Sequence, residues 1–289
     1  MTKTERSGRI ARNLLLVLGI VVILAAVRER YDPFLVLFLD DWVQPKPMPL
    51  EVPLSENLAL RLYADTRPHV GKVASLQKGL VLVHQGRELI EEGYGFGLPI
   101  VQVGDVAYLS RHATVSLQRD ADRVTLVKAF TMDVADRPTR FLRVKYEDVE
   151  SLGTVVFSYT LHGPDTLEVT VDFTGLAVAW DAVYLMNEQG AVNFPVYEDG
   201  QGHTWSGDDV GIWRAVDDHV GCWRHRTEAL RFCVQTEPGR RKFVGRERYN
   251  QYRWTGIFYL SWSGVDIEID PPLPRYRYQV RIETLHSGE

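Results

Sequence analysis

The sequence lacks the short motifs by which several enzyme classes are identified. It contains no G-x-S-x-G, H-E-x-x-H or phosphate-loop pattern, so nothing in it supports a serine hydrolase, a zinc protease or a nucleotide-binding enzyme. Gly93, Gly95 and Gly97 do not have G-x-G-x-x-G spacing, and we expect them to permit sheet bulges or close backbone approach instead. The two cysteines lie too far apart for a zinc site, and no calcium-binding loop is present. We therefore expect no metal and no other cofactor.

Positive charge is scarce outside the N-terminus. The net charge is −5, and residues 1–30 carry six basic against two acidic side chains, a net charge of +4 that leaves −9 for the remainder. Nucleic-acid binding requires many contacts between basic side chains and phosphates, so the acidic body argues against a nucleic-acid partner. The sequence identifies no particular protein partner.

Long apolar runs are also scarce, and the one clear case is N-terminal. Residues 14–27, LLLVLGIVVILAAV, contain no polar side chain and follow a basic tail at residues 1–13. This pattern predicts a transmembrane anchor over residues 14–31, and a cleaved signal peptide is the alternative. The excess of positive charge before the run places the tail in the cytoplasm and the rest of the chain outside, as a single-pass membrane protein.

Residues 32–54 are expected to connect the anchor to the body. The apolar stretch FLVLFL at residues 34–39 is too short to cross a bilayer, and it would either lie at the membrane interface or form a buried piece of the body. Prolines at positions 45, 47, 49 and 53 favour polyproline II and hence a semi-rigid spacer.

Amphipathic helical patterns are missing from the body, residues 55–289, where apolar and polar residues alternate instead. TLEVTVDF at residues 166–173 places four apolar side chains on one face, and VVFSYTL at residues 155–161 precedes it across a turn. Residues 123–130, 140–146, 256–262 and 276–283 alternate in the same way. No fixed repeat occurs, which argues against propellers and solenoids. We predict an all-β fold, a large antiparallel β-sandwich of about twelve to sixteen strands.

The cysteines, Cys222 and Cys233, stand in CWRHRTEALRFC. If Thr227 and Glu228 form a two-residue turn, the cysteines lie opposite each other on paired strands. An oxidising compartment permits a disulfide, but this register makes them a hydrogen-bonded pair whose side chains are splayed apart. The sequence leaves a disulfide and two free thiols as equal alternatives.

Three acidic residues of VDIEID at residues 265–270 share one strand face, and the arginines of the last strand alternate in a similar way. Like charges in a row repel one another, so we expect these two sets to form a cross-strand salt ladder.

The alternation stops at Tyr184–Trp205, YLMNEQGAVNFPVYEDGQGHTW, and we expect this segment to lie at the rim of the sandwich. Glu188 follows an apolar strand and is a candidate general acid or base, with His203 as its proton partner. Aromatic side chains could cover the apolar face of a sugar ring while polar groups take its hydroxyls. The expected ligand-contacting residues are Asn187, Tyr197, Trp205, Asp208 and Trp213. The alternative is a solvated loop, with Asp208 capping a turn.

Four parts of the sequence together resemble the galactose-mutarotase-like β-supersandwich: FSYTLHGPDTLEVTVDF, the YLMNEQ strand end, the loop that carries His203, and the closing strand YRYQVRIE. This superfamily includes aldose epimerases and sugar-processing enzyme domains, and the resemblance covers roughly residues 55–283. It implies a carbohydrate groove on the concave face of the sandwich. Asn187 is not followed by the His-Pro pair of the epimerases, so the resemblance does not imply epimerase activity.

The sequence thus predicts a membrane-anchored, extracytoplasmic β-sandwich that binds or processes carbohydrate at the cell envelope. Whether the protein is an enzyme stays open, because catalysis would require Glu188 and His203 to converge on one pocket. The alternative function is that of a non-catalytic structural or assembly protein of the envelope that binds a protein partner.

Overall fold

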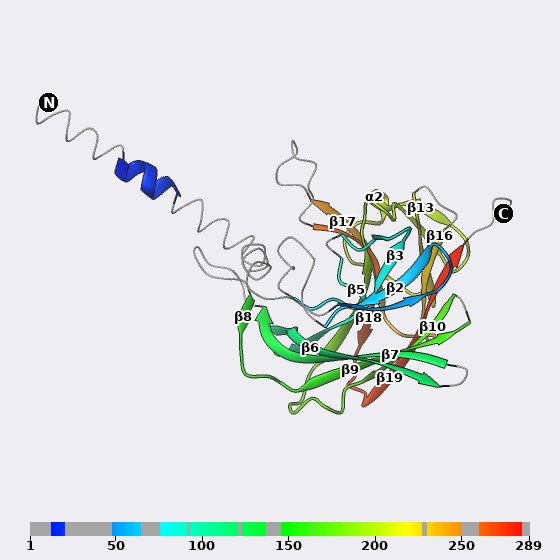
Figure 1. Ribbon diagram of the computed structural model, residues 1–289, viewed down its shortest axis with the longest axis horizontal. Coiled ribbons are helices and arrows are strands. Elements are labelled where there is room, and N and C mark those ends of the chain that lie inside the picture. Colours follow the sequence, from blue (N-terminus) through cyan, green and yellow to red (C-terminus); the bar gives the residue numbers. More distant parts are fainter. Residues whose placement is uncertain are drawn as a thin grey trace, which may run out of the picture.

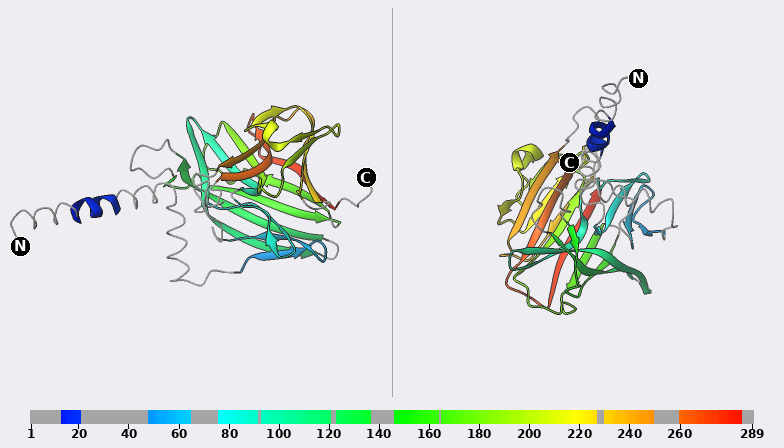
Figure 2. Two further views of the ribbon diagram at one scale, coloured as in Figure 1. Left: turned by 90° about the horizontal axis from the view of Figure 1, so that it is seen from above. Right: turned by 90° about the vertical axis from the view of Figure 1, so that its left-hand side faces the viewer.

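The computed structural model confirms an all-β body made of antiparallel sheets (Figure 1, Figure 2). It describes residues 13–20, 48–64, 76–91, 93–120, 123–136, 146–163, 165–226, 230–249 and 260–284. Within these ranges nineteen strands and one short helix, α2 (Gly207–Val210), form the body. The strands outnumber the expected set because several of them are only two to four residues long.

A small sheet has the strand order β1-β2-β3-β4. Its strands are β1 (Leu50–Pro53), β2 (Leu58–Leu62), β3 (Val81–His84) and β4 (Arg87–Glu88). Strand β1 thus forms inside the segment expected to be a spacer. Pro53 is compatible with it because it is the last residue of an edge strand, where a missing N–H group need not cost a ladder hydrogen bond.

The large sheet follows the order β13-β12-β15-β16-β19-β10-β9-β7-β6-β5-β11-β18-β17-β14, with β8 beside β7. Its strands are β5 (Gly95–Val103), β6 (Val106–Asp120), β7 (Arg123–Asp136), β8 (Tyr146–Asp148), β9 (Thr154–His162), β10 (Thr166–Asp172), β11 (Ala182–Gln189), β12 (Val196–Asp199), β13 (Thr204–Ser206), β14 (Arg214–Val216), β15 (Val220–Arg224), β16 (Leu230–Gln235), β17 (Lys242–Tyr249), β18 (Leu260–Ile269) and β19 (Arg275–Thr284).

This sheet folds back on itself, so that its two halves pack face to face as a sandwich. Three buried side chains cross between the halves. Tyr159 Oη of β9 donates to two backbone carbonyls of β5, at 3.0 and 3.1 Å. Tyr278 Oη of β19 donates to Asn187 Oδ1 of β11 at 2.9 Å, and Trp223 Nε1 of β15 donates to the Gly264 carbonyl of β18 at 2.9 Å. Each of these three side chains therefore has a hydrogen-bond partner on the opposite layer.

The alternation predicted at residues 166–173 is confirmed. Leu167, Val169, Val171 and Phe173 are at most 3% exposed, while the residues between them are half-buried on the other face. The predicted hairpin also forms, with β9 antiparallel to β10. Period-two patterning identified these strands because one face of each packs into the interior.

Gly97 shows why glycine is needed where the two layers approach. Its φ of 79° lies in the left-handed region, and a Cβ atom there would lie 2.7 Å from Tyr159 Oη and 2.8 Å from the ring of Phe157. The close backbone approach expected at this glycine-rich stretch is therefore present.

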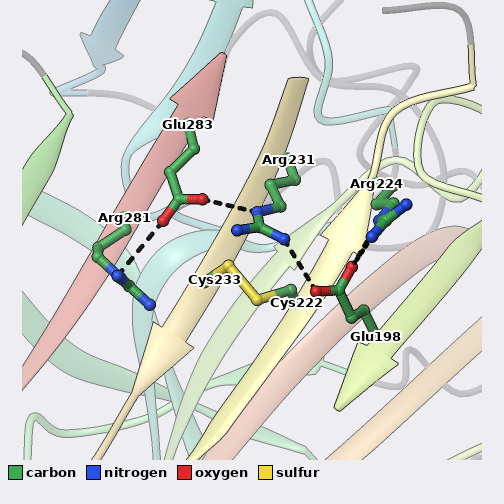
Figure 3. The surroundings of a disulfide bond; sticks show 7 residues. All are labelled: Glu198, Cys222, Arg224, Arg231, Cys233, Arg281 and Glu283. Carbon is green, nitrogen blue, oxygen red and sulfur yellow. Dashed lines mark hydrogen bonds and ion pairs between the residues drawn. A yellow bond between two sulfur atoms is a disulfide. The ribbon is translucent and has the colours of Figure 1, made fainter. Parts of the chain in front are cut away.

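The structure joins Cys222 of β15 to Cys233 of β16 in a disulfide (Figure 3). The two residues are register partners, as the sequence predicts, but they form the closely spaced, non-hydrogen-bonded type of pair, with Cα atoms 4.0 Å apart. His225 N donates to Leu230 O at 2.8 Å, so residues 225 and 230 form a hydrogen-bonded pair. The expected turn would have made 226 and 229 the hydrogen-bonded pair, and this difference of one residue changes the pair type at the cysteines. The geometric objection to a disulfide was therefore wrong.

Figure 3 also shows a ladder of alternating charges across β12, β15, β16 and β19. Its members in spatial order are Arg224, Glu198, Arg231, Glu283 and Arg281. The ladder predicted between residues 265–270 and the last strand is wrong, because β18 pairs with β11 and β17 whereas β19 pairs with β10 and β16. The arginines of β19 instead contact carboxylates of β10 and of β19 itself.

Residues 13–20 form a helix. In the ranges that the structure describes, no helix has both the length and the apolar character needed to cross a membrane. The predicted anchor from residue 21 onward, the apolar stretch at residues 34–39 and the first two prolines of the spacer lie outside the described residues.

Candidate functional site

A pocket lies where the two ends of the large sheet meet. Strands β12 and β13 from one end and β14 and β17 from the other form its walls, and α2 contributes one side chain. The pocket holds about 110 Å³. Its lining comprises Tyr197, Asp199, Trp205, Val210, Arg214, Val216, Asp218 and Val244. Two of the predicted ligand-contacting residues, Tyr197 and Trp205, are among them.

The hairpin of β12 and β13 brings the two aromatic rings together. Tyr197 and Trp205 are cross-strand partners, so their side chains point to the same face. Their rings stack with centroids 5.7 Å apart and planes inclined by 28°. Trp223 of the neighbouring strand β15 contacts Tyr197 from the interior, with ring centroids 5.4 Å apart. The aromatic wall is therefore supported from behind by the core.

Asp199 forms the turn of this hairpin. Its Oδ1 accepts the backbone N–H groups of Gln201 and His203, at 2.9 and 2.8 Å, and its Oδ2 lies 3.1 Å from His203 Nδ1. Burial acts to raise the pKa of Asp199, but the hydrogen bonds from His203 and Gln201 outweigh it and lower the pKa. A local Asx-type turn in EDGQGH thus fixes the position of Trp205 two residues later.

Tyr197 carries a buried hydroxyl without a partner. The side chain is 3% exposed, and its Oη has no hydrogen bond to any residue that the structure describes. Burial and the charges of Asp218 and Asp199 raise its pKa, while Arg214 acts to lower it. Buried hydroxyls are normally hydrogen-bonded, so Tyr197 Oη is one of the exceptions among the described residues.

Asp218 and Arg214 complete the polar lining. Asp218 is half-buried and Arg214 is exposed, and neither makes a hydrogen bond or ion pair within the described part of the chain. The pocket therefore combines an aromatic wall and three valines with one hydroxyl, one guanidinium and two carboxylates. This composition is typical of sites for small polar molecules that have an apolar face.

The structure does not bring the two predicted catalytic residues together. Glu188 belongs to β11 and is 1% exposed, with its Oε2 accepting the Tyr94 N–H at 3.0 Å. His203 lies on the β12–β13 turn with 65% of its side chain exposed, and its described partner is Asp199. Neither residue lines the pocket.

Asn187 also departs from the expected rim position. It is fully buried, donates from Nδ2 to the Leu185 carbonyl at 3.0 Å and accepts the Tyr278 hydroxyl. Asn187, Glu188 and Gln189 extend β11 past a register shift at Met186, so they are strand residues and not part of a polar loop. The interruption of the alternation at residues 187–189 therefore marks buried polar side chains, whereas residues 200–204 are exposed.

Trp213 and Asp208 lie apart from the pocket as well. Trp213 stacks on Phe243 with ring centroids 5.3 Å apart, and its ring centroid lies 5.5 Å from that of Tyr184. Phe243 faces Ala215 of β14, whereas alternate residues of that strand line the pocket, so Trp213 occupies the opposite face. Asp208 of α2 is paired with the guanidinium of Arg246.

Three polar residues of the pocket, Asp199, Arg214 and Asp218, were not predicted. Asp199 had a signal, because it stands two residues after Tyr197 and shares its strand face. Arg214 comes from β14 at the far end of the strand order, and Asp218 comes from the link between β14 and β15, so no local pattern relates them to Tyr197.

Comparisons with known proteins give a weak similarity in structure alone. No family model matches the chain, and no curated protein matches it. Among solved structures, an α-N-acetylgalactosaminidase of Bifidobacterium bifidum in complex with GalNAc is 11% identical, with a TM-score of 0.49, over 83% of this chain and 36% of that one. A heparan sulfate lyase of Pedobacter heparinus is 10% identical, with a TM-score of 0.43, over 86% of this chain and 38% of that one. The chain thus spans little more than a third of these two proteins.

An Escherichia coli K12 protein described as a "Putative aldose 1-epimerase" is 12% identical, with a TM-score of 0.43, over 82% of this chain and all of that one. The weak galactose-mutarotase-like resemblance stated from the sequence is therefore also found among solved structures. At these identities and scores the similarity carries no argument about what this chain binds.

Proposed function

We propose that this protein binds a saccharide, without catalysing a reaction, in the pocket between Tyr197, Trp205, Arg214 and Asp218. The observation that supports this function best is the stacked pair of Tyr197 and Trp205 beside an unpartnered buried hydroxyl. A sugar ring has an apolar C–H face that packs on an indole. Its hydroxyls form hydrogen bonds with the polar side chains of a pocket.

Binding is favoured over catalysis by the separation of the two candidate catalytic groups. Glu188 is enclosed in the interior, while His203 stands exposed on a turn. A general acid and its partner must reach one common substrate atom, and neither of these two side chains lines the pocket.

Replacing Trp205 tests this function. In the full-length chain, purified in detergent, Trp205→Ala should weaken binding to a saccharide found on a glycan array about tenfold or more, because the stacking surface is lost. Trp213→Ala is the matched control, since it removes the same side chain from the opposite face and should leave affinity unchanged. Failure of the unaltered protein to bind any saccharide would refute the proposal, as would equal affinity of Trp205→Ala.

A second candidate function is binding of a protein partner at the exposed apolar side chains next to β14. Ile212 is 62% exposed and Trp213 is 37% exposed, and Trp213 holds a φ of 53° that non-glycine residues seldom adopt. Under this alternative Trp213→Ala, and not Trp205→Ala, would abolish the function.

The location that we propose is the outer side of a membrane, with the apolar run at residues 14–27 as anchor. The asymmetric charge around this run supports the orientation. The disulfide of Cys222 and Cys233 also supports it, because such bonds persist in oxidising compartments.

A further inference from the structure

We infer that the pocket selects neutral sugar units over acidic ones, and that Asp218 determines this selectivity. The inference rests on the proposed function and adds to it the chemical class of the ligand: a hexose with free hydroxyls, as opposed to a uronic acid or a sulfated sugar.

The first support is the set of polar atoms that lack partners. Tyr197 Oη is buried and unpartnered, and Asp218 and Arg214 make no hydrogen bond or ion pair within the described part of the chain. A sugar hydroxyl donates one hydrogen bond and accepts others, so it can donate to the Asp218 carboxylate while it accepts from Arg214. Hydrogen bonds to charged groups are stronger than those between neutral groups. A neutral ligand can therefore bind to these side chains through hydrogen bonds alone, without an ion pair.

The second support is the balance of charge. The lining contains two carboxylates and one guanidinium, a net charge of −1. The Asp199 carboxylate is already occupied by its own turn, which leaves Asp218 as the carboxylate that can accept from a ligand. Outside the lining, the Lys242 ammonium interacts with the charges of both Asp218 and Asp217, and these two carboxylates outnumber it.

The size of the pocket makes this charge effective. A volume of about 110 Å³ keeps any bound group close to Asp218, with the apolar walls of Val210, Val216 and Val244 around it. A carboxylate or sulfate on the ligand would meet a like charge at short range, where repulsion is strong. A neutral ring of the same shape avoids that cost.

The experiment compares matched sugars with the full-length protein in detergent. The probes are methyl glucoside with methyl glucuronide and methyl galactoside with methyl galacturonide, each pair differing only at C6, and the readout is affinity by calorimetry. We expect at least one neutral sugar to bind about tenfold or more tightly than its acidic counterpart. In Asp218→Asn, which keeps the shape of the side chain, this ratio should fall below about threefold.

Two further variants make the test specific. Asp209→Asn removes the same charge from an exposed residue of α2 outside the pocket, and it should leave the ratio unchanged. Arg214→Gln makes the pocket more negative and should raise the ratio, so the inference stays testable even if Asp218→Asn fails to fold.

The outcomes separate this inference from the proposed function. If no sugar binds the unaltered protein, the saccharide function itself is refuted. If an acidic sugar binds as tightly as its neutral counterpart, or if neither Asp218→Asn nor Arg214→Gln changes the ratio, the selectivity is refuted while the saccharide site stands.

Discussion

Glu188 and Asp266 are two carboxyl groups on the same face of adjacent strands, both removed from water. Asp266 Oδ1 accepts the Asn187 N–H at 2.9 Å, while its Oδ2 has no hydrogen-bond partner among the described residues. Burial raises the pKa of Asp266 to about 7. Burial and the charge of Asp266 raise the pKa of Glu188, although the Tyr94 N–H and Lys78 oppose this effect. The pair therefore favours protonation in the folded protein.

Such a pair should make stability depend on pH. Because the folded state holds the protons more tightly, its contribution to stability is present below the unfolded pKa of about 4 and is lost as the pH rises through about 7. Between pH 5 and pH 8 the titration of Asp266 should cost about 2 kcal/mol of the free energy of unfolding, and Asp266→Asn should remove most of this loss. Urea unfolding at the two pH values measures it.

Other charged side chains near the pair also influence its titration. Glu188 and Glu247 have the same sign of charge as Asp266, and Lys78 has the opposite sign. In Asp266→Asn the titration of Glu188 should therefore still make the free energy of unfolding depend on pH, but less strongly. An unchanged loss of stability between pH 5 and pH 8 in that variant would show that other groups control the titration.

At the scale of elements, β12 is held on both of its faces. Tyr197 of β12 packs inward on Trp223, while Glu198 faces outward into the charge ladder between Arg224 and Arg231. The neighbouring strands β15 and β16 are joined by the disulfide. Surface ion pairs contribute little individually, so we expect the disulfide to be the larger stabilising link of this group.

Removing the disulfide should therefore lower stability without changing the fold. The double variant Cys222→Ala/Cys233→Ala should lose about 2–3 kcal/mol in the free energy of unfolding, the amount expected for a crosslink that closes a short loop. Urea unfolding with and without reducing agent measures the loss. Reducing agent should destabilise the unaltered protein and leave the double variant unaffected; sensitivity of the double variant would point to a different cause.

The strands could be predicted from sequence and the site only in part, for a physical reason. Alternation reports which face of a strand is buried, and it identified β9 and β10 correctly. It fails at residues 187–189, where polar side chains are buried and satisfied by distant partners such as Tyr278. Trp205 was identified because its hairpin partner Tyr197 is local, whereas Arg214 and Asp218 reach the pocket through tertiary packing.

At the scale of the whole molecule, charge is divided between a basic N-terminus and an acidic body. The first 30 residues carry a net charge of +4 and the remainder −9. A positive segment before an apolar run is retained in the cytoplasm, so under the proposed location this asymmetry would orient the chain across the membrane.

This orientation predicts where the body is accessible. The full-length protein should sediment with membranes, and protease added to the outside of intact cells should digest the body. In Leu18→Arg/Ile23→Arg, two charges in the apolar run should shift the protein to the soluble fraction, since each costs about 2.5–3.5 kcal/mol at the centre of a bilayer. Digestion only after the cells are broken open would contradict the orientation.

The strand order has a mechanical consequence for the pocket. Backbone hydrogen bonds run continuously from β13 around the body to β14, but these two end strands do not pair with each other. This seam between β13 and β14 is therefore closed by α2 and residues 211–213, which join the two strands along the chain, and not by a strand ladder. A molecule that touches Tyr197 on one side and Arg214 on the other would span the seam, and its arrival should slow amide exchange in strands at both ends of the order together.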